Sequence, residues 1–189
     1  MKRDIFIFLP TFFQPALQRS IAQLFKLAHE KDLTTSFDMQ SDPQDKWNMD
    51  FGSILPHVDL FFPNEHELLK LTRSNSLTDA IDKITPYSNV LAIKRGANGS
   101  VVVFNNTSVQ HAGYVSPQVV DAIGAGDSFN AGFIFEFLNN KRLEVCQDFA
   151  NKTGAWSTTA PGGTTAFSTL KNAAQYVRDQ FSHAKATSP

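Results

Sequence analysis

Short apolar runs alternate along the chain with longer stretches in which apolar residues recur every three or four positions. The first pattern is typical of buried strands, and the second of helices that lay one face on a sheet. Leu17, Ile21, Leu24 and Ala28, for example, share one face of a predicted helix. The whole pattern predicts strands at residues 4–9, 33–38, 57–62, 89–95, 100–104 and 108–112, and helices at residues 15–30, 65–71, 77–85, 125–138, 143–158 and 170–181.

Turn-forming residues separate several of these elements. The dipeptide Asn98-Gly99 lies between two β-rich runs, which is a strong signal for a hairpin. Asn105-Asn106 marks a second turn, and residues 39–45 form a polar loop that contains a proline. Because most strands alternate with helices, we expect an α/β fold whose sheet is largely parallel.

Composition narrows the class of protein. The chain has 189 residues, a formal net charge of -1 and 42% hydrophobic residues, which suits one globular domain over residues 1–189. No apolar run is long enough to cross a bilayer, and the stretch after the charged start is interrupted at Pro10. We therefore expect a cytoplasmic protein that binds neither membrane nor nucleic acid.

Cysteine and histidine offer little chemistry. Cys146 is the only cysteine, so an internal disulfide and a cysteine metal cluster are excluded, and we expect this residue to pack within a helix. The five histidines are scattered without the spacing of a zinc site.

Residues 121–133 form the most informative segment, because a carboxylate follows a turn of small residues and precedes an apolar helix. Gly124 and Gly126 allow backbone amides to face a ligand. The amides of the first helical turn and the helix dipole would stabilise an anion there, and Asp127 could take a proton from a substrate hydroxyl. A simple strand-to-helix turn, in which Asp127 only complements the dipole, explains the segment equally well.

This segment resembles the signature Asp-Thr-x-Gly-Ala-Gly-Asp of the ribokinase-like sugar kinases, the PfkB carbohydrate kinase family. Ala122 stands where the signature has threonine. The resemblance implies that Asp127 contacts the sugar and acts as the catalytic base, while Gly124, Ala125 and Gly126 form the anion hole. It also implies ATP as phosphoryl donor and a doubly wound, ribokinase-like sheet flanked by helices.

The run Pro63-Asn64-Glu65-His66-Glu67 allows two interpretations. Asn64 can cap a helix, and Glu67 can return a bond to the cap amide, which makes a capping box. The family often has Asn-x-x-Glu at this place. By resemblance, Glu67 helps to hold Mg²⁺ through water, and Asn64 lies near the nucleotide phosphates.

Other candidate residues are less specific. Lys94, Arg95, Gly96 and Gly99 fit a hairpin with solvent-facing basic residues, but the resemblance places such a loop beside the nucleotide. The resemblance also implies further nucleotide contacts and a site for a monovalent cation such as K⁺. The nucleotide contacts are Asn151 and the loop glycines Gly162 and Gly163, and the cation ligands are backbone oxygens of Asp121 and Ile123.

Two other nucleotide-binding classes fit poorly. The glycines of residues 124–126 lack the spacing of a dinucleotide fingerprint, and the chain has no Gly-Lys-Ser or Gly-Lys-Thr for a P-loop. The set of protein-kinase motifs is missing as well. The resemblance to sugar kinases, in contrast, runs from about residue 6 to residue 167 with several motifs in order.

Compared with that family, the chain lacks the first strands, the Gly-Gly sugar-binding turn and the β-sheet lid. We therefore expect an N-terminally truncated kinase for a small sugar such as ribose, fructose, 2-keto-3-deoxygluconate or a nucleoside. The alternatives are an inactive remnant that binds nucleotide or a full-length partner without turnover, or a shortened gene product with little activity. A sheet edge or apolar face without its covering strands would favour self-association, including a homodimer.

Overall fold

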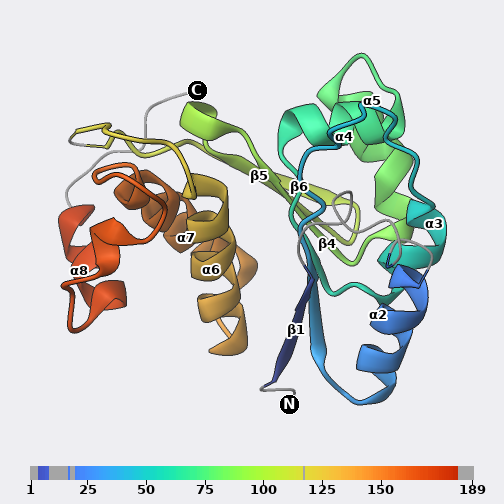
Figure 1. The fold of residues 1–189 in the computed structure, drawn as a ribbon, viewed down its shortest axis with the longest axis horizontal. Helices are drawn as coiled ribbons and strands as arrows, with labels where there is room; N and C mark the ends of the chain where they lie inside the picture. Colours follow the sequence, from blue (N-terminus) through green and yellow to red (C-terminus); the bar gives the residue numbers. More distant parts are fainter. Residues whose placement is uncertain (1–3, 9–16, 18–19, 117, 183–189) are drawn as a thin grey trace. The chain divides into compact units, whose positions relative to one another are not determined.

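The computed structural model of the chain describes residues 4–8, 17, 20–116 and 118–182 (Figure 1). The strands are β1 (Ile5–Phe8), β2 (Thr34–Phe37), β3 (Leu60–Phe61), β4 (Val90–Lys94), β5 (Ser100–Phe104) and β6 (Thr107–His111). The α-helices are α2 (Ile21–Glu30), α3 (Phe51–Ile54), α4 (Glu65–Thr72), α5 (Leu77–Ile84), α6 (Ala125–Leu138), α7 (Leu143–Ser157) and α8 (Ala173–Gln180). Single 3-10 turns are η1 (Leu55–His57), η2 (Thr85–Tyr87), η3 (Gly96–Asn98) and η4 (Thr165–Phe167).

The strands form one six-stranded sheet in the order β1-β2-β3-β4-β5-β6. Strands β1 to β4 pair in parallel. The connections from β4 to β5 and from β5 to β6 are only a few residues long, too short for a parallel crossover, so these pairs are antiparallel. The expectation of an α/β fold with a largely parallel sheet is therefore confirmed, and the last two strands make the sheet mixed.

Two compact units divide the described residues. Unit 1 comprises Met1–Ile93 and Val102–Ser108, and unit 2 comprises Lys94–Val101 and Val109–Pro189. The boundary passes through β4, β5 and β6. The organisation of residues 1–189 as a single domain stays a prediction.

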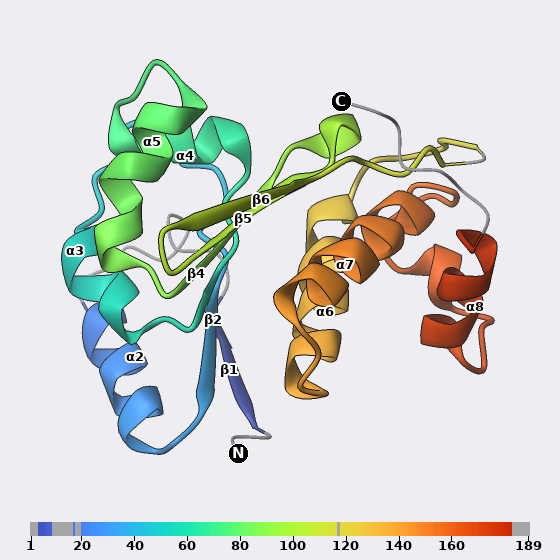
Figure 2. The same cartoon turned by 180° about the vertical axis from the view of Figure 1, so that it is seen from behind.

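In unit 1, the helices α2 to α5 lie on one face of the parallel strands, as Figures 1 and 2 show from opposite sides. From β1 to β4, each strand that comes next in the chain lies beside the previous one, always on the same side of it in the sheet. Right-handed crossovers that all step in one direction place their helices on one face. The strand order thus accounts for this layer of helices.

Aromatic side chains join α2 to the strands beneath it. The ring of Phe25 is fully buried and meets the rings of Phe8 and Phe37 edge-on, at centroid distances of 5.9 and 5.4 Å. Phe37 in turn stacks on Phe61 of β3 at 5.5 Å. This row of rings carries the packing from β1 to β3, and Phe25 is the residue through which the helix joins it.

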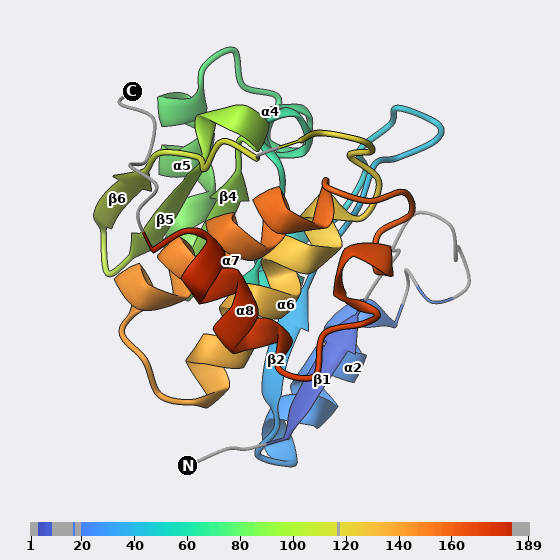
Figure 3. The same cartoon turned by 90° about the vertical axis from the view of Figure 1, so that its left-hand side faces the viewer.

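Unit 2 is built on the close pairing of α6 with α7, against which α8 packs (Figure 3). A Cβ atom added at Gly132 of α6 would lie 2.2 Å from Thr153 Oγ1 of α7. Only glycine allows the two helices to approach this closely. Phe149, Val177 and Phe181 form the buried core between α7 and the end of α8.

The structure corrects some predicted boundaries. The strand predicted at residues 57–62 is only the two-residue β3, because His57 belongs to a 3-10 turn. Pro63, which has no N–H group, follows soon after β3. The short helix α3 was not predicted, since four residues carry too little periodicity. Residues 15, 16, 18 and 19 of the helix predicted over residues 15–30 lie outside the described residues.

The role of Phe25 predicts a large difference between two positions on α2. Phe25→Ala should lower the free energy of unfolding by about 3–5 kcal/mol, because it leaves a cavity among buried rings. Leu27 is 45% exposed on the same helix. Leu27→Ala should therefore cost no more than about 0.5 kcal/mol. Urea denaturation followed by circular dichroism measures both, and similar losses would contradict this packing.

Candidate functional site

The start of helix α6 is shaped by a glycine in the left-handed region. Gly124 is the N-cap residue with φ 76°, and its carbonyl accepts the amide of Ser128 at 2.9 Å. Amides in the first turn of a helix have no acceptor within the helix and carry its positive dipole end. The Ala125 amide donates to the Ala122 carbonyl at 3.2 Å, so the donors that this first turn offers to an anion are the amides that follow, at Gly126 and Asp127.

A second glycine packs directly against this turn. A Cβ atom added at Gly124 would lie 2.3 Å from the Cα atom of Gly163, a distance that real side chains do not tolerate. Gly162, one residue earlier, also has a positive φ of 67° but has open space around it. The loop glycines therefore reach the α6 N-terminus, although 38 residues separate Gly162 from Gly124.

Asp121 holds these two segments together. Its carboxylate accepts the amides of Gly162 and Ile123, each at 2.9 Å. These bonds, that from Gly162 first, lower the pKa of Asp121 below its ordinary value because they stabilise the ionised form. Asp121 was predicted as a backbone ligand of a monovalent cation, which stays a prediction. Its side chain has a structural role that the sequence did not reveal.

Asp127 lies in the first turn of α6, where its side chain is exposed. Lys94, at the end of β4 in the same unit, lies beside that turn, with its Nζ atom 3.6 Å from the position of a Cβ at Gly126. The structure thus brings a carboxylate, a cation and helix N-terminal amides together. Such a set can take up a proton and hold a negatively charged group at the same place.

The hairpin that follows Lys94 has its own need for glycine. Gly99 has φ 80°, and a Cβ atom there would lie 2.1 Å from the carbonyl oxygen of His111. Gly96 has φ 56° and nothing within 4 Å. The hairpin expected at Asn98-Gly99 is confirmed, with Arg95 donating its amide to Gly99. Nucleotide contacts of Lys94, Arg95, Gly96 and Gly99 stay predictions.

Asn151 lies in a buried polar network instead of on the surface. It is 7% exposed, and its side-chain amide donates to Ser100 Oγ of β5 at 3.0 Å. Gln147, one turn earlier on α7, donates to Ser100 and to the Val109 carbonyl. These bonds fasten α7 to the strands. The bond to Ser100 serves the fold, and the nucleotide contact of Asn151 stays a prediction.

The Asn64–Glu67 pair belongs to unit 1 and forms a complete capping box on α4, so this interpretation is confirmed. Asn64 Oδ1 accepts the Glu67 amide at 2.8 Å, and Glu67 Oε2 accepts the Asn64 amide at 2.9 Å. Ser41 Oγ donates to Glu67 Oε1 at 3.4 Å. Glu67 is only 4% exposed, so its charge is stabilised by these donors.

Oxygen donors of this kind fit Mg²⁺, which prefers oxygen ligands and keeps several waters. Glu67 Oε1 and Ser41 Oγ are oxygen atoms of this kind, and a bound water would join them to a metal. Within the described residues, no group of three or more His, Cys, Asp or Glu side chains is arranged to hold a metal ion. The metal role of Glu67 stays a prediction.

One polar cluster escaped the sequence analysis. Asp148 of α7 accepts from Tyr114 at 2.5 Å and pairs with Lys152 at 2.8 Å, and His111 Nε2 lies 3.3 Å from it. Burial, followed by the hydrogen bond to Asp148, raises the pKa of Tyr114 far above its ordinary value. His111 and Tyr114 lie far from Asp148 in the sequence, and no sequence motif includes these residues.

Cys146 packs within α7, as expected, and is fully buried. Burial, and next the charge of Glu136, raise the pKa of Cys146 to about 12. The thiol is therefore protonated and unreactive at neutral pH. Among the helices that the structure describes, none is both long and apolar enough to cross a membrane.

Comparison with known proteins identifies the family. The profile of the pfkB family of carbohydrate kinases matches residues 4–170, most of the chain. The chain therefore belongs to the pfkB family of carbohydrate kinases. The fold expected from the motif of residues 121–127 is the fold of this family.

Two curated relatives show how much of the kinase the chain represents. An ATP-dependent ribose-1-phosphate kinase of Halopiger xanaduensis is 32% identical over 136 residues, which are 71% of this chain and 43% of that protein. A nucleoside kinase of Methanocaldococcus jannaschii is 30% identical over 128 residues, 67% of this chain and 41% of its own length. The chain thus spans less than half the length of these relatives.

Solved structures agree with the fold. A probable sugar kinase from Rhizobium etli superposes with a TM-score of 0.80 at 21% identity, over 94% of this chain and 54% of that one. The adenosine kinase of Sinorhizobium meliloti gives 0.79 at 25% identity over the same shares. Nearly the whole chain therefore shares a fold with about half of each of these kinases.

The contact between Gly124 and Gly163 predicts unequal effects of alanine at two glycines. Gly162→Ala should cost about 1–2 kcal/mol, because alanine disfavours a positive φ. Gly124→Ala should lose a similar amount and a further 1–3 kcal/mol or so, because the new methyl group meets the backbone of Gly163. Thermal unfolding compares the two variants. Equal losses would show that the glycines do not touch.

The bonds of Asp121 predict a titration. Because the folded pKa is lowered, these bonds contribute stability above the ordinary value of 3.8 and are lost as pH falls through the lower folded value. In an NMR titration, the amide protons of Ile123 and Gly162 should move upfield together with a midpoint below 3.8. A midpoint at or above 3.8, or independent shifts, would contradict the assignment.

Proposed function

We propose that this chain carries the nucleotide-binding and phosphoryl-transfer part of an ATP-dependent kinase that acts on a hydroxyl of a small sugar. The observation that supports this most is the start of α6 in a member of the pfkB family. There Asp127 follows a turn that the Gly124–Gly163 contact shapes, and Lys94 lies beside it. The cytoplasmic location belongs to the same proposal.

In the proposed reaction, Asp127 takes the proton from the acceptor hydroxyl as its oxygen attacks the γ-phosphorus of ATP. The bond between that phosphorus and the bridging oxygen breaks, and ADP leaves. Charge on the transferring group is held at the turn of Gly124, Ala125 and Gly126, where the Ala125 amide would have to exchange the Ala122 carbonyl for the phosphoryl group. Lys94 adds a positive charge at the same place, and Asp127 ends the step protonated.

The nucleotide is held by residues of the glycine loops in this proposal. In unit 2, Gly162 and Gly163 approach its adenine side, the segment from Arg95 to Gly99 approaches its phosphates, and Asn151 contributes from α7. A phosphate contact of Asn64, in unit 1, stays a separate prediction. Glu67 of unit 1 would hold Mg²⁺ through water, and the ion would neutralise phosphate charge when bound. The backbone oxygens of Asp121 and Ile123 would hold a monovalent cation such as K⁺.

The acceptor is proposed from the chemistry of the relatives. They include a ribose-1-phosphate kinase, a nucleoside kinase and an adenosine kinase, whose names point to ribose or a nucleoside. A ribose-containing acceptor is therefore the first choice, with other small sugars next. A homodimer or other self-association belongs to the same proposal, because an uncovered sheet edge or apolar face would favour it.

A second candidate function is nucleotide binding without turnover. It is favoured by one observation, namely that the chain matches 54% or less of the kinases cited above. Phosphoryl transfer requires two positioned substrates and the exclusion of water. Those relatives have a further half, which this chain does not match, to meet these requirements.

The experiment that tests the proposal combines binding and turnover. Calorimetric titration with Mg-ATP should show one site, and a coupled assay should show ADP release that depends on ribose or a ribonucleoside. Binding without sugar-dependent release would support the second candidate instead. Absence of binding would contradict both.

A substitution separates the base from the binding site. Asp127→Asn should lower turnover by about 10²–10⁴-fold, because the base is lost, while affinity for Mg-ATP changes little because the amides stay. Asp82→Asn, at an exposed position of α5, is the matched control and should keep full turnover. Equal activity of the wild-type protein and Asp127→Asn would exclude Asp127 as base.

A further inference from the structure

Asp148 of α7 is the centre of a polar cluster that the proposed reaction does not use. Its Oδ2 atom accepts from Lys152 at 2.8 Å, and its Oδ1 atom accepts from the hydroxyl of Tyr114 at 2.5 Å. The ring of His111, at the end of β6, places its Nε2 atom 3.3 Å from the same Oδ1 atom. All four residues belong to unit 2. The cluster thus joins the end of β6 and the segment after it to α7.

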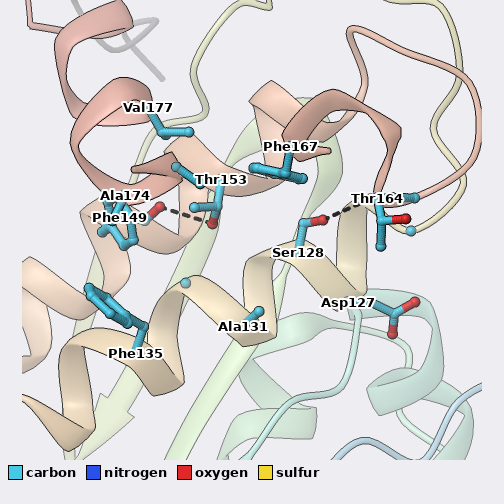
Figure 4. A pocket seen from close by; sticks show the side chains of 14 residues that line it. Asp127, Ser128, Ala131, Phe135, Phe149, Thr153, Thr164, Phe167, Ala174 and Val177 are labelled. Atoms are coloured by element: carbon cyan, nitrogen blue, oxygen red, sulfur yellow. Dashed lines mark hydrogen bonds between the residues drawn. The ribbon is translucent and has the colours of Figure 1, made fainter. Parts of the chain in front are cut away.

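The same helix also forms a wall of the proposed site. The cavity in Figure 4 has a volume of about 510 Å³ and is lined by Asp127, so it belongs to that site. Phe149 and Thr153 of α7 face this cavity, whereas Asp148 and Lys152 do not line it. Each of these two residues precedes a cavity residue by one position, which turns its side chain by about 100° around the helix. The cluster therefore lies on another face of α7 than the cavity.

Two glycines bring the residues of the cluster into contact with the Arg95–Gly99 loop. A Cβ atom added at Gly99 would lie 2.1 Å from the carbonyl oxygen of His111. One added at Gly113 would lie 2.4 Å from the carbonyl oxygen of Ala97. The loop therefore rests on the backbone at the end of β6 and just after it. Because closely packed parts of a protein transmit strain, a change in the position of His111 is passed on to the loop.

The imidazole ring of His111 faces an acceptor at each of its nitrogens. Nδ1 lies 2.7 Å from the Ala112 carbonyl oxygen, and Nε2 faces the Asp148 carboxylate. A neutral imidazole carries one N–H group, so one of its nitrogens then meets an acceptor with a lone pair. The imidazolium form donates at both nitrogens and attracts the carboxylate as well. Protonation of His111 therefore strengthens the link between β6 and α7.

Two further titratable groups face the same carboxylate. Lys152 lies 2.8 Å from Oδ2 of Asp148 and adds a positive charge, which opposes the protonation of His111. Tyr114 stays neutral, because burial and the hydrogen bond to Asp148 raise its pKa far above the ordinary value. The negative charge of Asp148 is therefore shared between Lys152 and protonated His111.

We propose that His111 is a positioning residue for the Arg95–Gly99 loop, and that its protonation strengthens the binding of nucleotide phosphates by this loop. The inference rests on the proposed function, which assigns the phosphates to the loop. A neutral ring loses one of its two contacts, and the end of β6, on which the loop rests, is then held less firmly to α7. Histidine ordinarily changes charge between about pH 5 and 8. Affinity for Mg-ATP should therefore fall as the pH rises through this range.

An NMR titration of the whole chain without nucleotide tests the link between His111 and the loop. The amide resonances of Ala97 and Gly99 should change at the same pH as the resonances of the His111 ring. Asp148→Asn keeps the shape of the side chain but removes its charge, so this pH should fall by about one unit. Lys152→Met removes the opposing charge, so the pH should rise. A merely structural role of the cluster would not give these opposite shifts.

Calorimetric titration with Mg-ATP at about pH 6 and about pH 8 tests the effect on binding. The ratio of the affinity at the lower pH to that at the higher pH should be about fivefold larger for the wild type than for His111→Gln. Because both proteins meet the same nucleotide, this comparison cancels the titration of ATP itself. His29→Gln, at an exposed histidine of α2, is the matched control and should keep the wild-type ratio.

Several results would overturn the proposal. They are loop resonances that do not follow the His111 ring, an unchanged titration in Asp148→Asn, and equal affinity ratios for the wild type and His111→Gln. An equal loss of the ratio in His29→Gln would overturn it as well. The titration of the wild type needs no variant, so it decides the case in which a variant fails to fold. If the chain binds no Mg-ATP at any pH, the proposed function fails, and the loop resonances then decide the positioning role of His111 by themselves.

Discussion

The start of α6 depends on the close approach of two glycines that are far apart in sequence. Gly124 and Gly163 lie so near each other that a single methyl group at Gly124 would meet the Gly163 backbone. The positive φ of Gly124 orients the first turn of α6, and the Asp121 carboxylate fixes the second loop by binding the Gly162 amide. The position of Asp127 and of the amides before it follows from this contact.

The sequence predicted those features that depend on neighbouring residues. The helix expected at residues 125–138 is α6 with the same bounds, because an apolar helical pattern follows a glycine turn directly. The capping box of Asn64 and Glu67 and the hairpin at Gly99 were likewise predicted, since each is a matter of local spacing. Local chemistry was sufficient in these cases.

Features that depend on distant contacts could not be predicted. The nucleotide contact of Asn151 stays a prediction, and nothing in the sequence indicated that its amide bonds to Ser100, 51 residues earlier. The contact of Gly124 with Gly163 gave no signal, because a pair of glycines in a loop also serves ordinary turns. The short length of β3 could not be predicted for the same reason, because pairing with neighbouring strands decides where a strand ends.

The chain belongs to the pfkB family but matches only part of the length of its relatives. The fold is that of pfkB kinases, yet it covers only about half of the solved kinases that it superposes on. The α6 N-terminus, the Lys94 hairpin and the Gly162–Gly163 loop all belong to unit 2. We therefore propose that unit 2 contains an anion site whether or not a sugar is bound.

A crystal structure of the chain with magnesium and a non-hydrolysable ATP analogue tests that claim most directly. We predict a phosphate within hydrogen-bond distance of the first-turn amides of α6, with the Lys94 ammonium beside it. An analogue bound with its phosphates elsewhere, or a first turn of α6 that holds no phosphate at saturating analogue, would contradict it.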